Sequence, residues 1–177
     1  MSTEERKSDR QMFVYDLIYP AFLGAMLFEI VPLKCSVEYF IGLTIVIYYL
    51  LDFFHLYFYL RKRFNERQRN TVRYVVFDFF VSLLLFFSFR YVDKNLNVTI
   101  CTITFVPLCF LVYASELKYR IKFYRLYFIL IVVAAIIWFT YIPENIKLIS
   151  ALIYISAMTF SYGFFIFTTP KLVSHND

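Results

Sequence analysis

Four ionisable side chains stand in segments that are otherwise strongly apolar: Asp16, Asp52, His55 and Asp78. An ionisable group inside a membrane costs about 3 kcal/mol or more, so it usually marks a function or a structural pair. Asp52 and His55 are three residues apart and therefore share one face of a helix. The chemistry open to these residues is a cation-attracting vestibule, a proton relay or a metal site, although a metal needs more ligands than one His and scattered Asp residues guarantee.

A structural alternative gives the same carboxylates no chemical role. In that interpretation they pair with Arg10, Arg61 and Arg73 near the helix ends and fasten the first three helices together. The predicted inner polar cluster consists of Arg10, Asp52, His55, Arg73 and Asp78.

The composition identifies the elements that must position these residues. Of the 177 residues, 61% are hydrophobic, 23% are aromatic and 18% are charged, with only 3 Gly and 5 Pro. A water-soluble domain of this size could not bury so much apolar surface. Disorder, a collagen-like fibre and a disulfide-rich secreted scaffold are excluded by the same figures. The sequence predicts an integral membrane protein.

The apolar residues form six continuous runs long enough to cross a bilayer, which takes about 20 helical residues. None shows the alternation of a membrane β-barrel. We therefore predict an all-α fold in which residues 1–177 form a single domain of six transmembrane helices with short termini. The predicted spans cover about residues 12–32, 37–60, 74–91, 98–116, 123–142 and 148–168.

The depth of the ionisable residues follows from these spans. Asp16 and Asp78 each lie about four residues into a span, and Asp52 and His55 lie near the end of a span that runs the other way. All four side chains are therefore expected in the same half of the membrane.

The basic residues predict the orientation. Fourteen of the 18 Lys and Arg residues belong to the N-terminal segment, the loop at 61–73, the segment 118–125 and the C-terminal tail. Because cytoplasmic loops are enriched in Lys and Arg, both termini are expected to be cytoplasmic. The loop at 61–73 is suited to contact with anionic lipid headgroups. Nucleic acid is not needed to explain the basic surplus.

Catalytic motifs are missing from the sequence. It contains no G-x-S-x-G, no H-E-x-x-H, no Walker motif and no Gly-rich loop. Three Gly residues are too few for a carbonyl-lined filter of the TVGYG kind. No catalytic residue, cofactor or metal ligand set is predicted, although an embedded enzyme remains an alternative below.

The first span carries a family resemblance. The segment 10–16 reads RQMFVYD, an apolar run leads to Glu29, and Pro32 follows. This pattern resembles the first helix of the endolysosomal-type six-transmembrane potassium channel family and its bacterial relatives, which opens with Arg, three residues and Phe-Ser-Asp. His55 could correspond to a His near the cytoplasmic end of the second span of the bacterial members. The match covers about 23 residues well and the rest only as topology.

The resemblance implies a bacterial inner-membrane channel for monovalent cations, built from several copies and a tetramer if it is channel-like. In that family the first helix lines the pore, with Asp near its start and apolar rings further along. The pore-lining candidates here are Asp16, Ala21, Gly24 and Phe28. Two features depart from the family pattern: Val14 and Tyr15 replace Phe-Ser, and Ala and Gly cannot form a tight aliphatic constriction.

The residues themselves support two interpretations of this stripe. Ala21, Gly24, Ala25 and Phe28 follow one another at helical spacing on one side of the first span. Small side chains permit close approach of another helix. The same stripe could instead border a pore on a symmetry axis.

Three functions therefore compete. The first is an oligomeric cation channel, with potassium as the candidate ion and its pore lined by the first span. The second is a membrane effector or scaffold that acts with a soluble partner. The third is a membrane-embedded enzyme or carrier for a lipid or small solute, which would use Asp16, Asp52, His55 and Asp78.

Overall fold

The computed structural model describes residues 17–30, 35–55, 71–116 and 121–168, and within these ranges the chain is all-α. The elements follow the predicted order along the chain. They are α2 (Tyr19–Ile30), α3 (Val37–Phe54), α5 (Thr71–Arg90), α6 (Leu96–Thr104), α7 (Val106–Glu116), α8 (Ile121–Tyr141), the short 3-10 helix η3 (Glu144–Ile146) and α9 (Lys147–Thr168).

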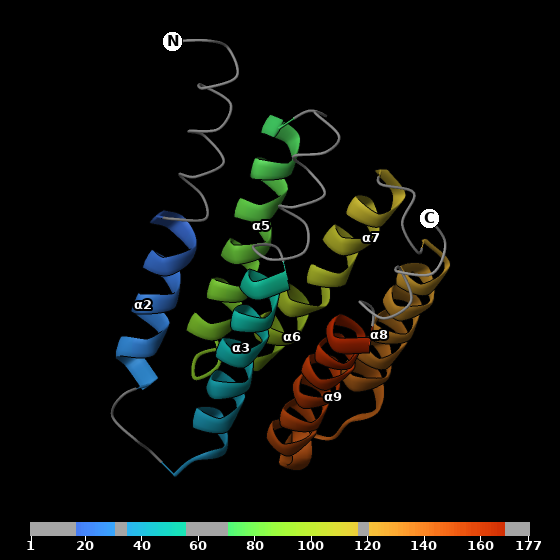
Figure 1. Cartoon of the computed structure of the whole chain (residues 1–177). Helices are drawn as coiled ribbons and strands as arrows, with labels where there is room; N and C mark the ends of the chain where they lie inside the picture. Colours follow the sequence, from blue (N-terminus) through green and yellow to red (C-terminus); the bar gives the residue numbers. More distant parts are fainter. Residues whose placement is uncertain (1–16, 31–34, 56–70, 117–120, 169–177) are drawn as a thin grey trace.

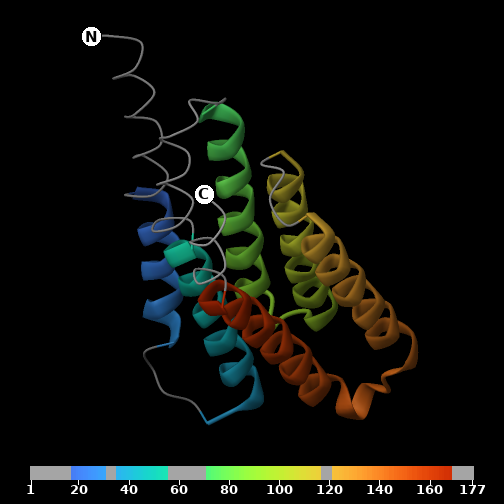
Figure 2. The same cartoon turned by 45° about the vertical axis from the view of Figure 1, so that its right-hand side comes forward.

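The helices alternate in direction along one bundle (Figure 1). The starts of α2, α5 and α8 and the ends of α3, α7 and α9 lie at one end, which we call the inner end. α2 lies at the edge of the bundle and packs against α3 and α5, while α3 packs most extensively against α9. Figure 2 shows that η3 joins α8 to α9 at the opposite, outer end, where α2 also ends and α3 begins.

Side-chain caps fix where two helices begin. The Ser36 hydroxyl accepts a hydrogen bond from the backbone N–H of Tyr39 at 3.2 Å, which starts α3. The Asn95 side chain accepts from the backbone N–H groups of Asn97 and Val98 and starts α6. Each cap satisfies backbone donors that have no partner within the first turn of the helix.

The fourth predicted span is two helices. α6 ends at Thr104, Phe105 forms a turn, and α7 begins at Val106. The cause is Pro107, which has no N–H to donate to the carbonyl of Ile103 and whose ring crowds that carbonyl. The backbone N–H groups of Leu108 and Cys109 both bond to the Phe105 carbonyl instead.

Within the described residues, three helices are long and apolar enough to span a membrane, namely 37–54, 124–141 and 144–164. Their outward faces are apolar as well as their inward faces. On α8 an exposed stripe at helical spacing is formed by Leu126, Leu130, Val133 and Ile137. A soluble monomer rarely exposes so continuous an apolar surface, so the structure has the character of an integral membrane protein.

A glycine brings α9 close to α3 beside the buried polar residues. A Cβ atom at Gly163 would lie 3.2 Å from Cδ1 of Leu51, which is tighter than ordinary contact. The missing side chain allows the two helices to approach. It also places the neighbouring Tyr162 beside Asp52 and His55 at the C-terminal end of α3.

Candidate functional site

A buried carboxylate lies at the centre of the described polar residues. The Asp52 side chain on α3 is fully buried. The Tyr19 hydroxyl on α2 donates to its Oδ2 at 2.9 Å, and the Tyr162 hydroxyl on α9 donates to its Oδ1 at 3.1 Å. One side chain therefore joins three helices by hydrogen bonds in a region from which water is excluded, where such bonds are strong.

His55 extends this network toward the inner end of α3. Its Nδ1 lies 3.0 Å from the hydroxyl of Tyr162, so that hydroxyl contacts both His55 and Asp52. Asp52 and His55 share one face of α3, as their three-residue spacing predicted. Asp52, Tyr162 and His55 form a continuous hydrogen-bonded chain, which we call the Asp52 chain.

Tyrosine also fixes the α2 side of the site. The Tyr49 hydroxyl on α3 donates to the backbone carbonyl of Tyr19 at 3.1 Å, and the two rings lie 5.2 Å apart. Tyr19 is thereby held on both its main chain and its hydroxyl. The inner end of α2 is attached to α3 through this pair.

A second carboxyl group belongs to the same region. Asp78 on α5 is also fully buried, and α5 packs against α3. Of the predicted cluster, Asp52 and His55 are joined through Tyr162, while Asp78 lies buried on the neighbouring helix. Arg10 and Asp16 lie outside the described residues, and the same holds for the side chain of Arg73.

The partners of Asp52 differ from those of the ion-pair interpretation. No Lys or Arg side chain in the described ranges pairs with Asp52, whose hydrogen bonds come from Tyr19 and Tyr162. Nor do three His, Cys, Asp or Glu side chains come together there as ligands for a metal ion. A proton relay is the chemistry that these contacts fit best.

Aromatic packing holds Tyr162 in place. Its ring stacks on Phe110 of α7 with centroids 4.8 Å apart, and Tyr48 of α3 meets it edge-on at 5.1 Å. The Tyr48 hydroxyl and the Thr159 hydroxyl are buried without a hydrogen-bond partner among the described residues. Such groups are uncommon in protein interiors, and the polar region is therefore wider than the Asp52 chain alone.

Sequence reasoning missed the tyrosines of this site. Only Tyr residues at the span ends, such as Tyr39, Tyr91, Tyr119 and Tyr141, were interpreted as anchors at the membrane interface. Tyr19, Tyr49 and Tyr162 were not singled out. A signal was present, because a Tyr deep within a span needs a partner for its hydroxyl. Tyr49 also precedes Asp52 by three residues, which puts it on the same helix face.

The pore-lining candidates of α2 point away from the bundle. Ala21 and Gly24 are exposed, and Phe28 exposes 83% of its surface. A Cβ atom at Gly24 would meet no other atom within 4 Å. The opposite side of α2 is buried through Tyr19 and Met26. This stripe therefore does not pack against any other part of the chain that the structure describes.

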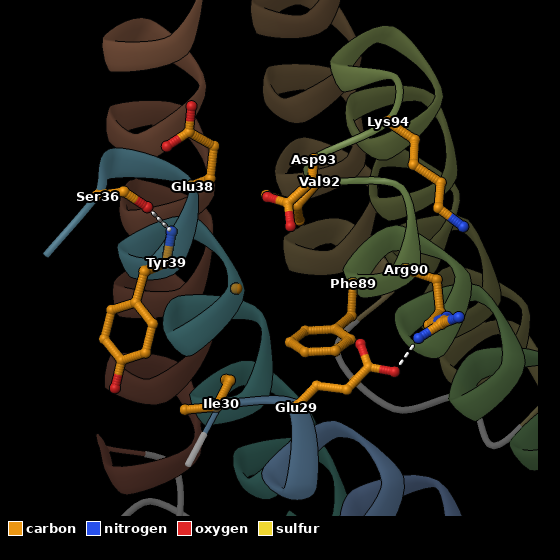
Figure 3. A pocket seen from close by; sticks show the side chains of 11 residues that line it. Glu29, Ile30, Ser36, Glu38, Tyr39, Phe89, Arg90, Val92, Asp93 and Lys94 are labelled. Atoms are coloured by element: carbon orange, nitrogen blue, oxygen red, sulfur yellow. Dashed lines mark hydrogen bonds and ion pairs between the residues drawn. The ribbon is translucent and has the colours of Figure 1, made fainter. Parts of the chain in front are cut away.

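A polar pocket lies at the outer end, remote from the Asp52 chain (Figure 3). Its volume is about 270 Å³, and it opens between the end of α2, the start of α3 and the end of α5. Glu29 forms an ion pair with Arg90 on its wall, while Glu38 and Asp93 belong to the same lining. Since both partners of this pair are partly exposed, it contributes about 1 kcal/mol at most.

Comparison with protein-family models, with curated proteins and with solved structures gave no match for this chain.

Proposed function

We propose that the chain is a six-span membrane protein, with cytoplasmic termini, that assembles into an oligomeric cation channel lined by α2. The observation that carries the proposal is the direction of the small-residue stripe. Ala21, Gly24 and Phe28 are exposed on the side of α2 that faces away from its own bundle. Another copy of the chain is the partner that this face fits.

The physical argument concerns what a membrane helix presents to lipid. Outward faces elsewhere in the chain carry large apolar side chains, as on α8. Gly and Ala offer lipid little contact area, but they allow another helix to approach closely. A face of small residues that ends in an exposed Phe28 is suited to a crossing of helices around a symmetry axis.

The cation preference follows from charge near that axis. Asp16 precedes the start of α2 by three residues and is predicted at the inner mouth. A ring of carboxylates raises the local concentration of cations, while apolar side chains further along exclude ions until the path is wetted. Potassium and sodium are the ions with which to test the pore.

Cross-linking at Gly24 tests the assembly directly. In a background with Cys35, Cys101 and Cys109 replaced by Ser, Gly24→Cys should be joined to other copies by a short bifunctional thiol reagent in native membranes. We expect a ladder of products that ends at the tetramer on a denaturing gel. Ala157→Cys, on the exposed side of α9, is the matched control and should stay monomeric.

Two outcomes of the cross-linking experiment would count against an interface at Gly24. Absence of cross-linking at Gly24, with the thiol shown to be reactive toward a monofunctional reagent, would contradict an interface on this face of α2. Equal cross-linking at both positions would indicate random collision in the membrane.

A second candidate function rests on a different observation. The Asp52 chain lies within one copy and joins α3 to α9, and the Tyr19 hydroxyl that donates to Asp52 adds α2. That arrangement favours a carrier for protons or a small polar solute over a pore between copies. A protein that moves solute as a monomer, with its activity removed by Asp52→Asn, would support this function.

A further inference from the structure

We propose that Asp52 is a proton-binding site in the interior of the bundle and that His55 loads it through the hydroxyl of Tyr162. The ligand is the proton itself. All three side chains belong to one chain, so the proposal does not depend on assembly into a channel.

Burial without a counter-charge favours the neutral acid. Asp52 is fully buried, and its described partners are two neutral hydroxyl groups rather than a cation. Removing a carboxylate from water is strongly unfavourable unless a cation compensates it.

Each neighbouring helix contributes to the surroundings of this acid. Among the described residues, the titratable side chains around it are Tyr19 of α2, Tyr48, Tyr49 and His55 of α3, Asp78 of α5, Cys109 of α7 and Tyr162 of α9. Within this set, imidazole is the type of group that ordinarily exchanges a proton near neutral pH. His55 is partly exposed at the inner end of α3, whereas Asp52 and Asp78 are fully buried.

The distances permit transfer along the chain. Oδ1 of Asp52 and the Tyr162 oxygen are 3.1 Å apart, and the Tyr162 oxygen and Nδ1 of His55 are 3.0 Å apart. Both separations lie within hydrogen-bond reach for proton transfer. A tyrosine hydroxyl can donate to one neighbour while it accepts from the other, and it can reverse both roles.

Loading transfers one net proton from water to Asp52. Before loading, Asp52 is a carboxylate, Tyr162 donates to it, and His55 is neutral with its proton on Nδ1. A proton from water binds Nε2 of His55. The Tyr162 O–H bond then breaks as Oδ1 of Asp52 gains that proton, and Nδ1 of His55 restores the Tyr162 hydroxyl. The products are a neutral Asp52, an unchanged Tyr162 and a neutral His55 that carries its proton on Nε2.

Infrared difference spectroscopy of the full chain in lipid tests the site, because a protonated carboxyl has a carbonyl-stretch band of its own. We expect a wild-type band that titrates with bulk pH and disappears in Asp52→Asn. Asp93→Asn, the control for an exposed carboxyl outside this site, should retain it. A wild type without any such band, or a band that persists in Asp52→Asn, would overturn the proposal.

Two further variants keep the test sharp if Asp52→Asn does not fold. Tyr19→Phe and Tyr162→Phe each remove one hydrogen bond to Asp52, so each should shift the frequency of the wild-type band. A band that neither variant shifts would belong to another carboxyl and would contradict the assignment.

The proton route from His55 through Tyr162 is tested separately, by the rate at which the carbonyl band appears after a rapid fall in pH. Tyr162→Phe and His55→Gln should slow loading by about a hundredfold, a typical contribution of a positioned proton donor. The final size of the band should be retained, since Asp52 itself remains. Loading at the wild-type rate in both variants would overturn the route through His55.

Discussion

Replacing Ala21 and Gly24 together with Leu is expected to reduce cation flux through the reconstituted protein by about tenfold or more while the chain still folds. Both positions are exposed on the outward side of α2, and nothing lies within 4 Å of a Cβ atom at Gly24. Leu therefore cannot disturb the bundle. On a pore axis, however, several copies of each added side chain would form an apolar constriction that resists wetting. Potassium efflux from liposomes is the measurement.

Two controls separate a blocked pore from a damaged protein. Ala157→Leu adds the same bulk to an exposed face of α9 and should leave flux unchanged. Gly42→Leu places bulk where a Cβ atom would already lie 3.2 Å from the Phe89 ring, so it should reduce folded protein instead. If the double variant conducts like the wild type, α2 does not line the path.

Tyr162→Ala should cost about 4 kcal/mol of unfolding free energy, the typical cost of truncating a buried aromatic side chain. Tyr162 exposes only 2% of its surface and stacks on Phe110. Its loss would leave a cavity among α3, α7 and α9. It would also remove a hydrogen-bond donor from the buried Asp52 and a partner from His55. Reversible denaturation in mixed micelles gives the free energy.

Tyr162→Phe separates the contribution of the aromatic ring to the free energy of unfolding from that of the hydroxyl. The ring and its stacking remain, so the loss should fall to about 2 kcal/mol, the range for leaving a buried polar group short of one hydrogen bond. Phe160→Ala, two residues away on the same helix but 75% exposed, should change stability much less than Tyr162→Ala. Equal losses at 160 and 162 would show that the described packing around Tyr162 does not hold.

Much of the fold could be predicted because long apolar runs identify membrane helices in a sequence. The apolar runs gave the order and approximate limits of α3, α5, α8 and α9, since a buried backbone in lipid must form its hydrogen bonds within a helix. The division between α6 and α7 was missed, although Pro107 stood within the predicted span as its visible cause.

The candidate site could be predicted only in part. The spacing of Asp52 and His55 placed them on one face, and their contacts with Tyr162 confirm it. Their partners could not be predicted, because the rotation of each helix is set by packing between segments far apart in the sequence. Tyr19 and Asp52 are separated by 33 residues, and Tyr162 and Asp52 by 110.

The direction of the α2 stripe depended on the same missing information. Ala21 and Gly24 at helical spacing fitted either packing inside the chain or an interface outside it. The burial of Tyr19 and Met26 shows that the other side of α2 faces the described helices, so the stripe does not pack against them. Tyr19 is held there by hydrogen bonds from its own hydroxyl to Asp52 and from Tyr49 to its carbonyl, contacts that the sequence did not reveal.

The most direct test of the channel proposal is potassium and sodium flux into liposomes that contain the purified wild-type protein, with the mass of the assembly measured in the same preparation. We predict cation flux from a tetramer and none from protein-free liposomes. A well-folded monomer without flux of either ion would contradict the channel, and the Asp52 chain would then be the starting point for a carrier within a single copy.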